Sequence, residues 1–353
     1  AALYRRSTER LAALDDLLVS RGRLGLVRLG HGDLHSGNIA VIDGKAQPFD
    51  AIEFDDAIAT GDVLYDAGFL IMDLADRGDR AGGRLFLDRF LAETVRLEAA
   101  ARVGRGADPG PATVAATLLD EIDGLSALGL FLSIRAALRA KIAAARAPHL
   151  DAAGRAAAEG EARRLFAAAI DHVEPRTPRL VAVGGLSGSG KSLLAQELAP
   201  RLAPSPGALV LRTDEIRKLL AGVVPTTRLS ADHYTAEASA AIYRVIETAA
   251  ARALAAGRSV VIDAVAAHPR ERAAFAAVAR AVEVPFLGLW LDVDEATAIA
   301  RVGGRRGDAS DADAGVVRFQ SGLDLGPIDW ARIDATGTPE ATFTAALRIA
   351  EGW

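Results

Sequence analysis

The chain has 353 residues, half of them apolar and a quarter charged, which is the balance of a soluble globular protein with room for two domains. Its net charge of −5 at pH 7 gives no general attraction to nucleic acid or to a membrane, so neither is expected as a partner. The absence of cysteine excludes disulfides, thiolate catalysis and cysteine-based zinc sites. We expect a cytoplasmic protein, and the oligomeric state is not indicated.

The first 173 residues have the pattern of a mostly α-helical domain with a short β-hairpin. Residues 3–20 have the spacing of an amphipathic helix. From residue 63 to about residue 170 the pattern is helical again, with breaks at residues 104–111 and at Pro148. Residues 135–141 carry a basic helix face, which is either an anion site or, as we favour, a solvated surface.

Two short strands are expected near the start of the chain, at residues 24–29 and 39–42. Asp43 and Gly44 follow the second of them and favour a tight turn. The segment after that turn is therefore expected to fold back on residues 39–42 as the second strand of a hairpin.

A phosphoryl-transfer signature, HGDLHSGN at residues 31–38, lies between these strands. Its Asp-x-x-x-x-Asn spacing, from Asp33 to Asn38, matches the catalytic loop of protein kinases. In that loop the aspartate orients or deprotonates the acceptor hydroxyl, and the asparagine binds Mg²⁺. Asp50 follows twelve residues after Asn38, where such kinases place a metal-binding aspartate, and the hairpin is expected to bring the two together.

The motif HGDLHSGN, with FDAIEF at residues 49–54 and DVLYD at residues 62–66, resembles the aminoglycoside-phosphotransferase-like kinases, in the variant fused to a P-loop kinase. This resemblance implies Asp33 as the catalytic base and Asn38 and Asp50 as metal ligands. The rival interpretation is a metal site at His31 and His35, although imidazoles in such loops more often make structural hydrogen bonds.

The sequence departs from those kinases upstream of the motif. They need a lobe with a glycine-rich loop and a lysine on the nucleotide phosphates. Only thirty residues precede His31, and no lysine precedes Lys45. The nucleotide-binding lobe is therefore missing from this sequence, and because the chain begins at alanine with Met72 as its only methionine, we expect a fragment of a longer protein.

Two prolines within residues 174–178 cannot continue a helix and predict a linker to a second domain at residues 179–353. In this domain apolar strands alternate with helical segments, which predicts a doubly wound parallel sheet with ligands at the carboxyl ends of its strands. The expected strands are residues 180–184, 208–212, 259–263, 286–291 and 331–334, and the longest expected helices are residues 234–256 and 269–281.

The stretch GGLSGSGKS at residues 184–192 matches the P-loop pattern G-x-x-x-x-G-K-[ST] between an expected strand and an expected helix. Its glycines let backbone N–H groups surround one phosphate. Lys191 is expected on the β- and γ-phosphates of ATP, and the Ser192 hydroxyl on Mg²⁺. The residues expected to bind the nucleotide are Gly185, Leu186, Ser187, Gly188, Ser189, Gly190, Lys191 and Ser192.

Aspartates follow the next strands of the expected sheet. Asp214 is placed to orient or deprotonate an acceptor hydroxyl. Thr213 or Asp214 would also cap the following helix well, and both roles can hold at once. Asp263, after four apolar residues, has the form of a Walker B aspartate that holds Mg²⁺. Asp292 is the competing candidate for that role.

Three arginines, Arg301, Arg305 and Arg306, precede the polar run GDASDAD at residues 307–313. Arginines on one helix face can neutralise charge on a transferring phosphoryl group. The polar run suits a lid that closes over substrate and excludes water. The alternative is a solvated surface of arginines and aspartates.

Residues 179–353 resemble the small P-loop kinases of the adenylate-kinase-like group, including predicted kinases that are usually described as AAA-family ATPases. The resemblance lies in GGLSGSGKS, RTDEIRK at 212–218, VVIDA at 260–264 and the run RVGGRRGDASDADAGVVRFQ at 301–320. It implies Lys191 and Ser192 on ATP–Mg²⁺, Asp214 at the acceptor, and Arg301 with Arg305 or Arg306 as lid arginines.

The sequence as a whole predicts an ATP- and Mg²⁺-dependent phosphotransferase whose second domain is the complete kinase module. By family analogy its acceptor is a small hydroxylated molecule, sugar-like or aminoglycoside-like. Two alternatives stay open: a regulatory nucleotide-binding switch, and a toxin-like kinase that acts on a nucleotide sugar.

Overall fold

The computed structural model describes residues 2–304 and 307–351. The chain divides into two compact units. The first unit comprises the chain up to Phe90, Asp123–Arg176 and Pro204–Pro206, and the second comprises Leu91–Ile122, Thr177–Ala203 and the chain from Gly207 onward. The predicted linker, residues 174–178, lies in an irregular segment close to the main division.

The first unit begins with two helices, α1 (Ala2–Ala13) and α2 (Asp15–Arg23), where the sequence predicted one helix over residues 3–20. That prediction is wrong at Leu14, whose ψ of 0° interrupts the helix. Leu14 is only 5% exposed, so the bend lets this side chain enter the core. No glycine or proline marks the break, and the apolar spacing continues across it.

The strands of the first unit form two small antiparallel pairs. The first short strand is confirmed over a narrower range, and it pairs with residues 60–62, which were not predicted as a strand. The predicted hairpin is confirmed: residues 39–42 pair with residues 45–48 through a turn in which Asp43 and Gly44 have φ of 51° and 73°. The elements here are β1 (Val27–Leu29), η1 (Ser36–Asn38), β2 (Ile39–Ile42), β3 (Lys45–Pro48), α3 (Asp56–Ala59) and β4 (Thr60–Asp62).

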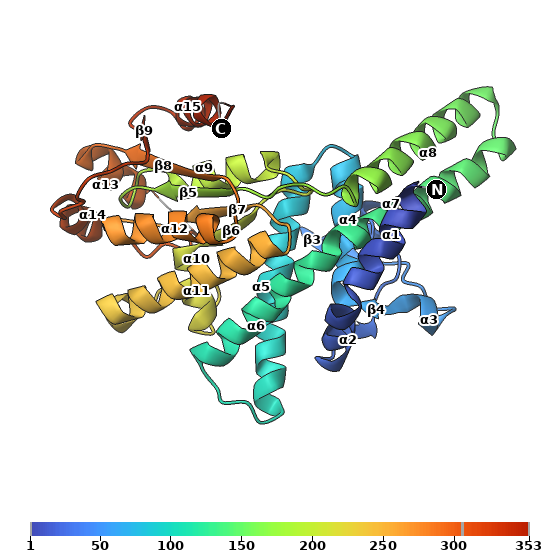
Figure 1. The fold of residues 1–353 in the computed structure, drawn as a ribbon, viewed down its shortest axis with the longest axis horizontal. Coiled ribbons are helices and arrows are strands. Elements are labelled where there is room, and N and C mark those ends of the chain that lie inside the picture. Colours follow the sequence, from blue (N-terminus) through green and yellow to red (C-terminus); the bar gives the residue numbers. More distant parts are fainter. Residues whose placement is uncertain (1, 305–306, 352–353) are drawn as a thin grey trace. The chain divides into compact units, whose positions relative to one another are not determined.

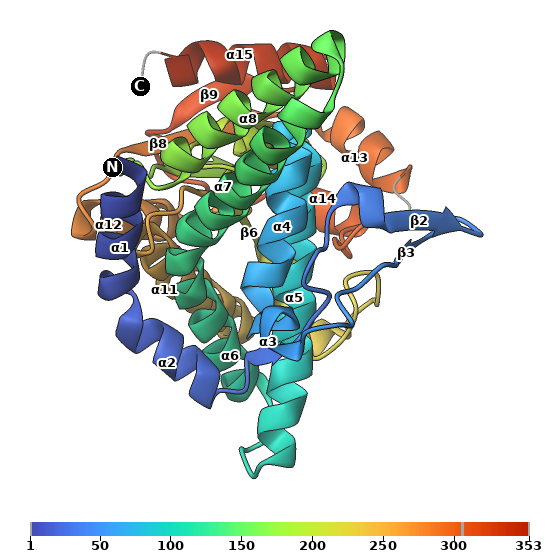
Figure 2. The same cartoon turned by 90° about the vertical axis from the view of Figure 1, so that its right-hand side faces the viewer.

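The predicted helical region is confirmed, with its breaks at residues 105–110 and at the 3-10 turn that holds Pro148. Within the first unit, α7 packs against both α4 and α8 (Figure 2). Arg135 on α7 is buried, with its guanidinium over the rings of Tyr65 and Phe69, so the expectation of a solvated basic face is wrong at this residue. The elements are α4 (Val63–Asp76), α5 (Arg80–Gly104), α6 (Pro111–Gly124), η2 (Leu125–Ala127), α7 (Leu128–Arg146), η3 (Ala147–His149) and α8 (Ala152–His172).

The second unit contains the predicted doubly wound sheet. Its five strands are all parallel, in the order β6-β7-β5-β8-β9, and each lies within one residue of its predicted range. The order reverses between β5 and β8, which is the switch point where ligands bind in such sheets. The strands are β5 (Leu180–Gly184), β6 (Leu209–Arg212), β7 (Val260–Asp263), β8 (Phe286–Asp292) and β9 (Ala331–Asp334).

Helices cover both faces of this sheet (Figure 1). The core between the sheet, α9 and α15 includes Val181, Val183, Leu194 and Leu291, because apolar residues at alternate strand positions point to one face. On the other face α11 and α12 contact β7 and β8. The elements are α9 (Lys191–Leu198), η4 (Ala199–Arg201), α10 (Thr213–Leu220), η5 (Ala231–Tyr234), α11 (Ala236–Ala255), α12 (Pro269–Ala281), α13 (Glu295–Gly303), α14 (Ala314–Ser321) and α15 (Pro339–Glu351).

Across residues 2–304 and 307–351, none of the helices combines the length and the apolar character needed to cross a bilayer.

Candidate active site

The loop from Gly185 to Gly190 joins β5 to α9, which confirms the strand–loop–helix context of the P-loop. Three of its glycines have positive φ: 139° at Gly185, 86° at Gly188 and 94° at Gly190. A Cβ atom would lie 2.7 Å from the Leu291 carbonyl oxygen at Gly185 and 2.6 Å from that of Ala298 at Gly188. Only glycine therefore fits where this loop passes close to neighbouring backbone.

The amino terminus of α9 forms an anion cradle. Its first-turn N–H groups have no partners within the helix and carry partial positive charge. Lys191 begins the helix, and its Nζ donates to the Leu186 carbonyl at 2.9 Å. The Ser189 hydroxyl is buried and has no hydrogen-bond partner among the described residues. These groups suit a phosphate.

Gln320 of α14 contacts this cradle. Its side-chain Oε1 accepts a hydrogen bond from the Ser187 backbone N–H at 2.8 Å. A phosphate that binds the Ser187 N–H has to displace this side chain. The sequence analysis missed Gln320, because a residue 133 positions along the chain gives no local signal of such a contact.

Carboxylates surround Arg212 at the end of β6. Its guanidinium lies 3.4 Å from Asp263 and 4.0 Å from Asp214, and it donates to Asp308. Burial alone would lower the pKa of Arg212, but the nearby charges of Asp263, Asp308 and Asp214 outweigh it and raise the pKa. Sequence reasoning passed over Arg212, although a cation that ends a buried strand is a recognisable signal.

Asp214 lies in the first turn of α10. The N-cap of that helix is Arg212 and makes no side-chain cap, so the expectation that Thr213 or Asp214 caps the helix is wrong. Burial raises the pKa of Asp214, the like charge of Asp263 adds to the rise, and Arg212 opposes it. The result is a carboxylate with a raised proton affinity at a strand end.

Asp263 and Asp292 differ in what their carboxylates contact. Asp263 is 3% exposed, and its Oδ2 accepts no hydrogen bond from the described residues. Asp292 accepts two hydrogen bonds from Arg332 at 2.8 Å and one from Trp290 at 3.1 Å. Asp263 Oδ2 thus lies in the site beside Arg212 Nε, at 3.4 Å, whereas Asp292 is engaged by Arg332 and Trp290.

The polar run at residues 307–313 is acidic where it meets the site. Asp308 binds Arg212, and Asp311 accepts from Lys218 Nζ at 3.0 Å, from the Leu229 N–H at 3.0 Å and from the Tyr234 hydroxyl at 2.5 Å. Lys218 is fully buried. These bonds hold the run, which we call the acidic lid, against α10, and the solvated alternative does not describe Asp308 and Asp311.

Arg301, one of the expected lid arginines, is not part of this arrangement. Arg301 donates to the carbonyls of Gly337 at 2.8 Å and Thr336 at 3.3 Å. It lines a second cavity instead of the one that contains Asp214. Arg305 and Arg306 lie outside the described residues.

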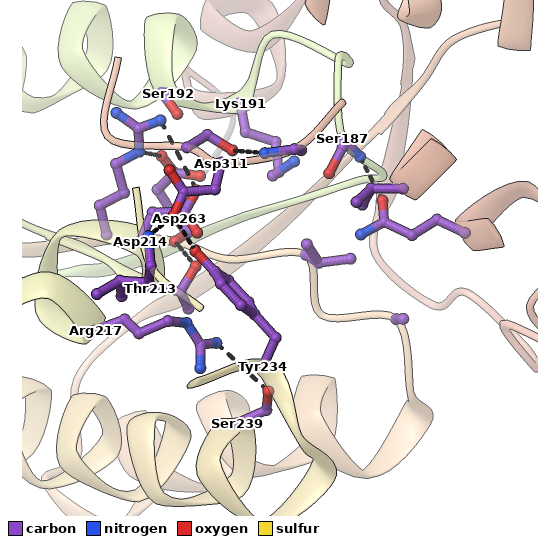
Figure 3. A pocket seen from close by; sticks show the side chains of 18 of the residues that line it. Ser187, Lys191, Ser192, Thr213, Asp214, Arg217, Tyr234, Ser239, Asp263 and Asp311 are labelled. Carbon is purple, nitrogen blue, oxygen red and sulfur yellow. Dashed lines mark hydrogen bonds and ion pairs between the residues drawn. The ribbon is translucent and has the colours of Figure 1, made fainter. Parts of the chain in front are cut away.

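Two cavities adjoin the P-loop. The larger, of about 670 Å³, is lined by Ser187, Lys191, Ser192, Asp214 and Asp263, together with Arg217 and Tyr234 (Figure 3). The second, of about 470 Å³, is lined by Ser189, Gly190, Arg301 and Phe343. Of the predicted site residues, one cavity is lined by Ser187, Lys191, Ser192, Asp214 and Asp263. The other is lined by Ser189, Gly190 and Arg301.

In the first unit, the loop at residues 31–38 brings Asp33 and Asn38 together. The Asn38 side-chain amide donates to the Asp33 backbone carbonyl at 3.1 Å and to its carboxylate at 3.5 Å. The Phe49 N–H donates to the Asn38 carbonyl at 2.9 Å, and Asp50 follows with a φ of 61°. The hairpin thus brings the backbone segments of Asn38 and Asp50 together as expected, and their metal-binding roles stay predictions.

Two aspartates of α4 fix this loop. Asp66 accepts from the N–H groups of His31 at 2.9 Å and Gly32 at 3.0 Å. Asp73 accepts from the N–H of Ser36 at 3.0 Å and from its hydroxyl. Burial would raise the pKa of Asp73, but these bonds and those of Arg77 hold it below its usual range.

The histidines of the loop make structural hydrogen bonds. His31 Nε2 lies 2.9 Å from the Phe49 carbonyl oxygen, and His35 Nδ1 accepts from the Gly37 N–H at 3.0 Å. In the part of the chain that the structure describes, no three His, Asp or Glu side chains gather as a metal site. These contacts favour the structural interpretation of both imidazoles.

Comparison with known proteins gives one family and several relatives. Residues 180–322 match the family model AAA_33, described as an AAA domain. Uncharacterized proteins of Mycobacterium tuberculosis (strain H37Rv) and Mycobacterium bovis are 29% identical over 341 residues, which cover 94% of this chain and 61% of theirs. The chain thus spans less than two thirds of the length of these relatives.

The similar solved structures cover half of the chain. A gluconokinase from Sinorhizobium meliloti is 20% identical, with 50% of this chain and 96% of that protein covered and a TM-score of 0.34. An APS kinase from Mycobacterium tuberculosis, in complex with AMPPNP and APS, is 21% identical, with 50% and 99% covered and a TM-score of 0.35.

Proposed function

We propose that the second unit is an ATP-dependent kinase that transfers the γ-phosphoryl group to a hydroxyl of a small, sugar-like molecule. One observation carries the proposal: the P-loop cradle and the two strand-end carboxylates, Asp214 and Asp263, line the same cavity of about 670 Å³. Phosphoryl transfer needs a cradle for the phosphates, charge neutralisation and an oriented hydroxyl, and this cavity offers groups for each.

Under this proposal the two cavities would hold the two ends of ATP. Because P-loop residues line both, the base and ribose fit the second cavity, of about 470 Å³, while the phosphates follow the loop into the first. Phe343 and Arg301 offer an apolar face and a cation in the second cavity. Lys191 would then neutralise the β- and γ-phosphates.

The donor set suits Mg²⁺, which prefers hard oxygen ligands and octahedral geometry. Asp263 has a buried carboxylate oxygen that accepts no hydrogen bond from the described residues, and the Ser192 hydroxyl lines the same cavity. These two residues would hold the ion. When bound, it neutralises charge on the β- and γ-phosphate oxygens.

Asp214 is the proposed base. Its raised pKa makes it a better proton acceptor than an ordinary aspartate. As the acceptor oxygen forms its bond to the γ-phosphorus, the bond from that phosphorus to the bridging oxygen breaks and ADP leaves. The hydroxyl proton passes to the Asp214 carboxylate.

Replacing Asp214 with asparagine (Asp214→Asn) is expected to lower kcat by about 10²- to 10⁴-fold, because the amide cannot take the proton. The same substitution is not expected to lower the stability of the fold at neutral pH. A carboxyl whose folded-state pKa is raised stabilises the fold below its ordinary pKa and loses that contribution as pH rises through the raised value. At neutral pH the variant should therefore melt no lower than the parent chain.

Melting curves across pH check this pair of effects. The melting temperatures of Asp214→Asn and the parent should converge as pH falls below the ordinary aspartate pKa. A variant that keeps the parent's kcat, or that melts lower at neutral pH, would contradict the role given to Asp214.

The direct test is ADP formation by the whole chain with Mg–ATP, with and without a panel of sugars, sugar acids and aminoglycosides. A kinase gives acceptor-dependent ADP and a phosphorylated product in equal amounts. Slow hydrolysis that no acceptor stimulates would refute the kinase proposal.

A second candidate, a nucleotide-operated switch, is favoured by the hydrogen bond from Ser187 to Gln320 at 2.8 Å. Phosphate binding at Ser187 would release α14 and could thereby signal nucleotide occupancy. The acceptor panel separates the two, since a switch needs no acceptor.

Replacing Gln320 with alanine (Gln320→Ala) is expected to tighten ATP binding. The phosphate then displaces no hydrogen bond, and one such bond is worth about 1 kcal/mol, or roughly fivefold in Kd. Gln320→Glu should act in the opposite direction, because it brings a carboxylate against the phosphates. Titration with a fluorescent ATP analogue measures both, and weaker binding by Gln320→Ala would show that the glutamine contacts the nucleotide instead.

For the first unit we propose a kinase-type catalytic loop, with Asp33 as base and Asn38 and Asp50 as metal ligands. The support is the contact of Asn38 with Asp33 and the anchoring of the loop by Asp66 and Asp73. Activity in a longer chain that contributes a nucleotide-binding lobe, compared between the parent and Asp33→Asn, tests it.

A further inference from the structure

Arg217 is a buried cation on the wall of the larger cavity. It lies on α10, is 7% exposed and is visible beside Tyr234 in Figure 3. Its guanidinium donates to the His233 carbonyl and, at 3.5 Å, to the Ser239 hydroxyl, and lies 4.7 Å from the centre of the Tyr234 ring. Its Nε is buried without a hydrogen-bond partner among the described residues.

The other described arginines that line this cavity, Arg212 and Arg228, have carboxylate partners, as does Lys218 on α10. Arg212 is flanked by Asp263, Asp214 and Asp308. Lys218 is 3.0 Å from Asp311, and Arg228 is 3.4 Å from Asp313. Among the residues that the structure describes, no Asp or Glu oxygen lies within 4.0 Å of the Arg217 nitrogens.

An unpaired buried charge is costly, and natural structures keep one where a partner of opposite charge binds. The hydrogen bonds of Arg217 go to neutral groups, and Asp214 acts on its charge without a direct ion pair. Burial lowers its pKa, yet an arginine stays protonated at neutral pH. The guanidinium thus places a fixed positive charge at the wall of the cavity, and its buried Nε has no hydrogen-bond partner among the described residues.

Arg217 and the proposed base are on the same helix face. Asp214 and Arg217 are three residues apart on α10, which places their side chains about 5 to 6 Å apart at Cβ. A ligand whose hydroxyl reaches Asp214 can therefore present a second group, a few bonds away, to Arg217.

We propose that the acceptor is a hydroxylated molecule that carries an anionic group, a carboxylate or a phosphate monoester, and that Arg217 binds this group. The inference rests on the proposed kinase function and narrows its acceptor. An anion site at Arg217 argues against the aminoglycoside-like acceptor that the sequence left open, because Arg217 repels a polycation.

The test is calorimetric titration of the whole chain in the presence of Mg²⁺ and AMPPNP, which keeps the P-loop occupied so that anions do not compete for it. Gluconate and glucose 6-phosphate are the anionic probes, glucose is the neutral one and kanamycin the cationic one. At least one anionic probe should bind about tenfold or more tightly than glucose, and kanamycin should be weakest. Comparing gluconate with glucose 6-phosphate shows whether the carboxylate or the phosphate is preferred.

Variants then assign the binding to Arg217. Arg217→Met should raise the Kd of the preferred anion about 10- to 100-fold, and Arg217→Lys should recover part of the loss, since lysine keeps the charge without the planar guanidinium. Arg228→Met is the matched control: Arg228 lines the same cavity, but its side chain is 72% exposed and pairs with Asp313. The Kd of Arg228→Met for the preferred anion should stay within about twofold of the parent value. Near-UV circular dichroism and melting curves check that the variants fold. If Arg217→Met does not fold, the comparison of Arg217→Lys with the parent is the test.

The inference is overturned if glucose or kanamycin binds as tightly as both anions, if no anionic probe binds at millimolar concentration, or if Arg228→Met and Arg217→Met weaken binding equally. ADP formation with the same four compounds separates this failure from that of the kinase proposal. Phosphorylation of glucose or kanamycin in preference to the anions keeps the kinase and refutes the anion site. Anion binding that depends on Arg217, with no phosphorylated product from any acceptor, keeps the anion site and refutes the kinase.

Discussion

Replacing Lys191 with alanine (Lys191→Ala) is expected to lower ATP turnover by at least about 10³-fold, the scale of losing a positioned charge from a transition state. Lys191 is the first residue of α9, and its Nζ contacts the Leu186 carbonyl inside the P-loop at 2.9 Å. No other lysine lines the larger cavity within the described residues. ADP release in a coupled assay measures the effect.

The control for this experiment is Lys141→Ala. Lys141 is exposed on α7 and belongs to the first unit, so the same loss of charge and side-chain length should leave turnover unchanged. Surviving turnover in Lys191→Ala would mean that the P-loop is not the site of ATP chemistry, or that another site dominates.

Replacing Asp311 with asparagine (Asp311→Asn) is expected to lower the free energy of unfolding by about 3 kcal/mol, because removing one partner of a buried ion pair leaves the other charge buried alone. The side chain of Lys218 is 1% exposed and that of Asp311 is 12% exposed. Asparagine has nearly the same shape, but one of the two accepting oxygens becomes an NH2 donor, so the loss includes hydrogen bonds as well as the charge. Urea denaturation followed by circular dichroism measures the loss.

A double variant that also replaces Lys218 is the control for this prediction. Adding Lys218→Met to Asp311→Asn removes the stranded cation and should recover part of the lost stability, whereas Asp311→Asn alone should not recover. Equal stability of Asp311→Asn and the parent would show that the ion pair contributes little and that other contacts hold the acidic lid.

The same pair has a defined dependence on pH. Burial opposes ionisation of Asp311, but the bonds from Tyr234, Leu229 and Lys218 outweigh it and hold the pKa of this carboxyl below its usual value. The contribution of the ionised Asp311 carboxylate to the free energy of unfolding is therefore present above the ordinary aspartate pKa. It is lost as pH falls through the lowered pKa. The stability gap between the parent and Asp311→Asn should close in acid.

The sequence predicted the parts of the second unit that depend on local pattern. The positions of all five strands are confirmed within one residue. The central strands β5 and β7 are short apolar runs, because a strand covered on both faces admits few polar residues. The P-loop context is confirmed for a related reason: Gly185 and Gly188 stand where a Cβ atom would collide with backbone. Such steric requirements can be seen in the sequence.

The contacts that were missed join residues far apart along the chain. Asp311 pairs with Lys218 over 93 positions, and Gln320 reaches Ser187 over 133. No local pattern encodes such a pairing. The arginines that precede the polar run were expected at the site, whereas the run itself brings Asp308 and Asp311 there. Leu14 is a smaller case: its break is set by packing of the core and not by a helix-breaking residue.

The burial of Lys218 has a chemical consequence. The chain has four lysines, of which Lys45 and Lys141 are exposed, whereas the ammonium group of Lys218 is enclosed by α10 and the acidic lid. An acylating reagent reaches this amine only when the Asp311 contact has opened and the ammonium has lost its proton. Mass spectrometry can follow the acylation of Lys218, with Lys45 as an internal standard. The rate of this acylation thus reports how often the lid opens.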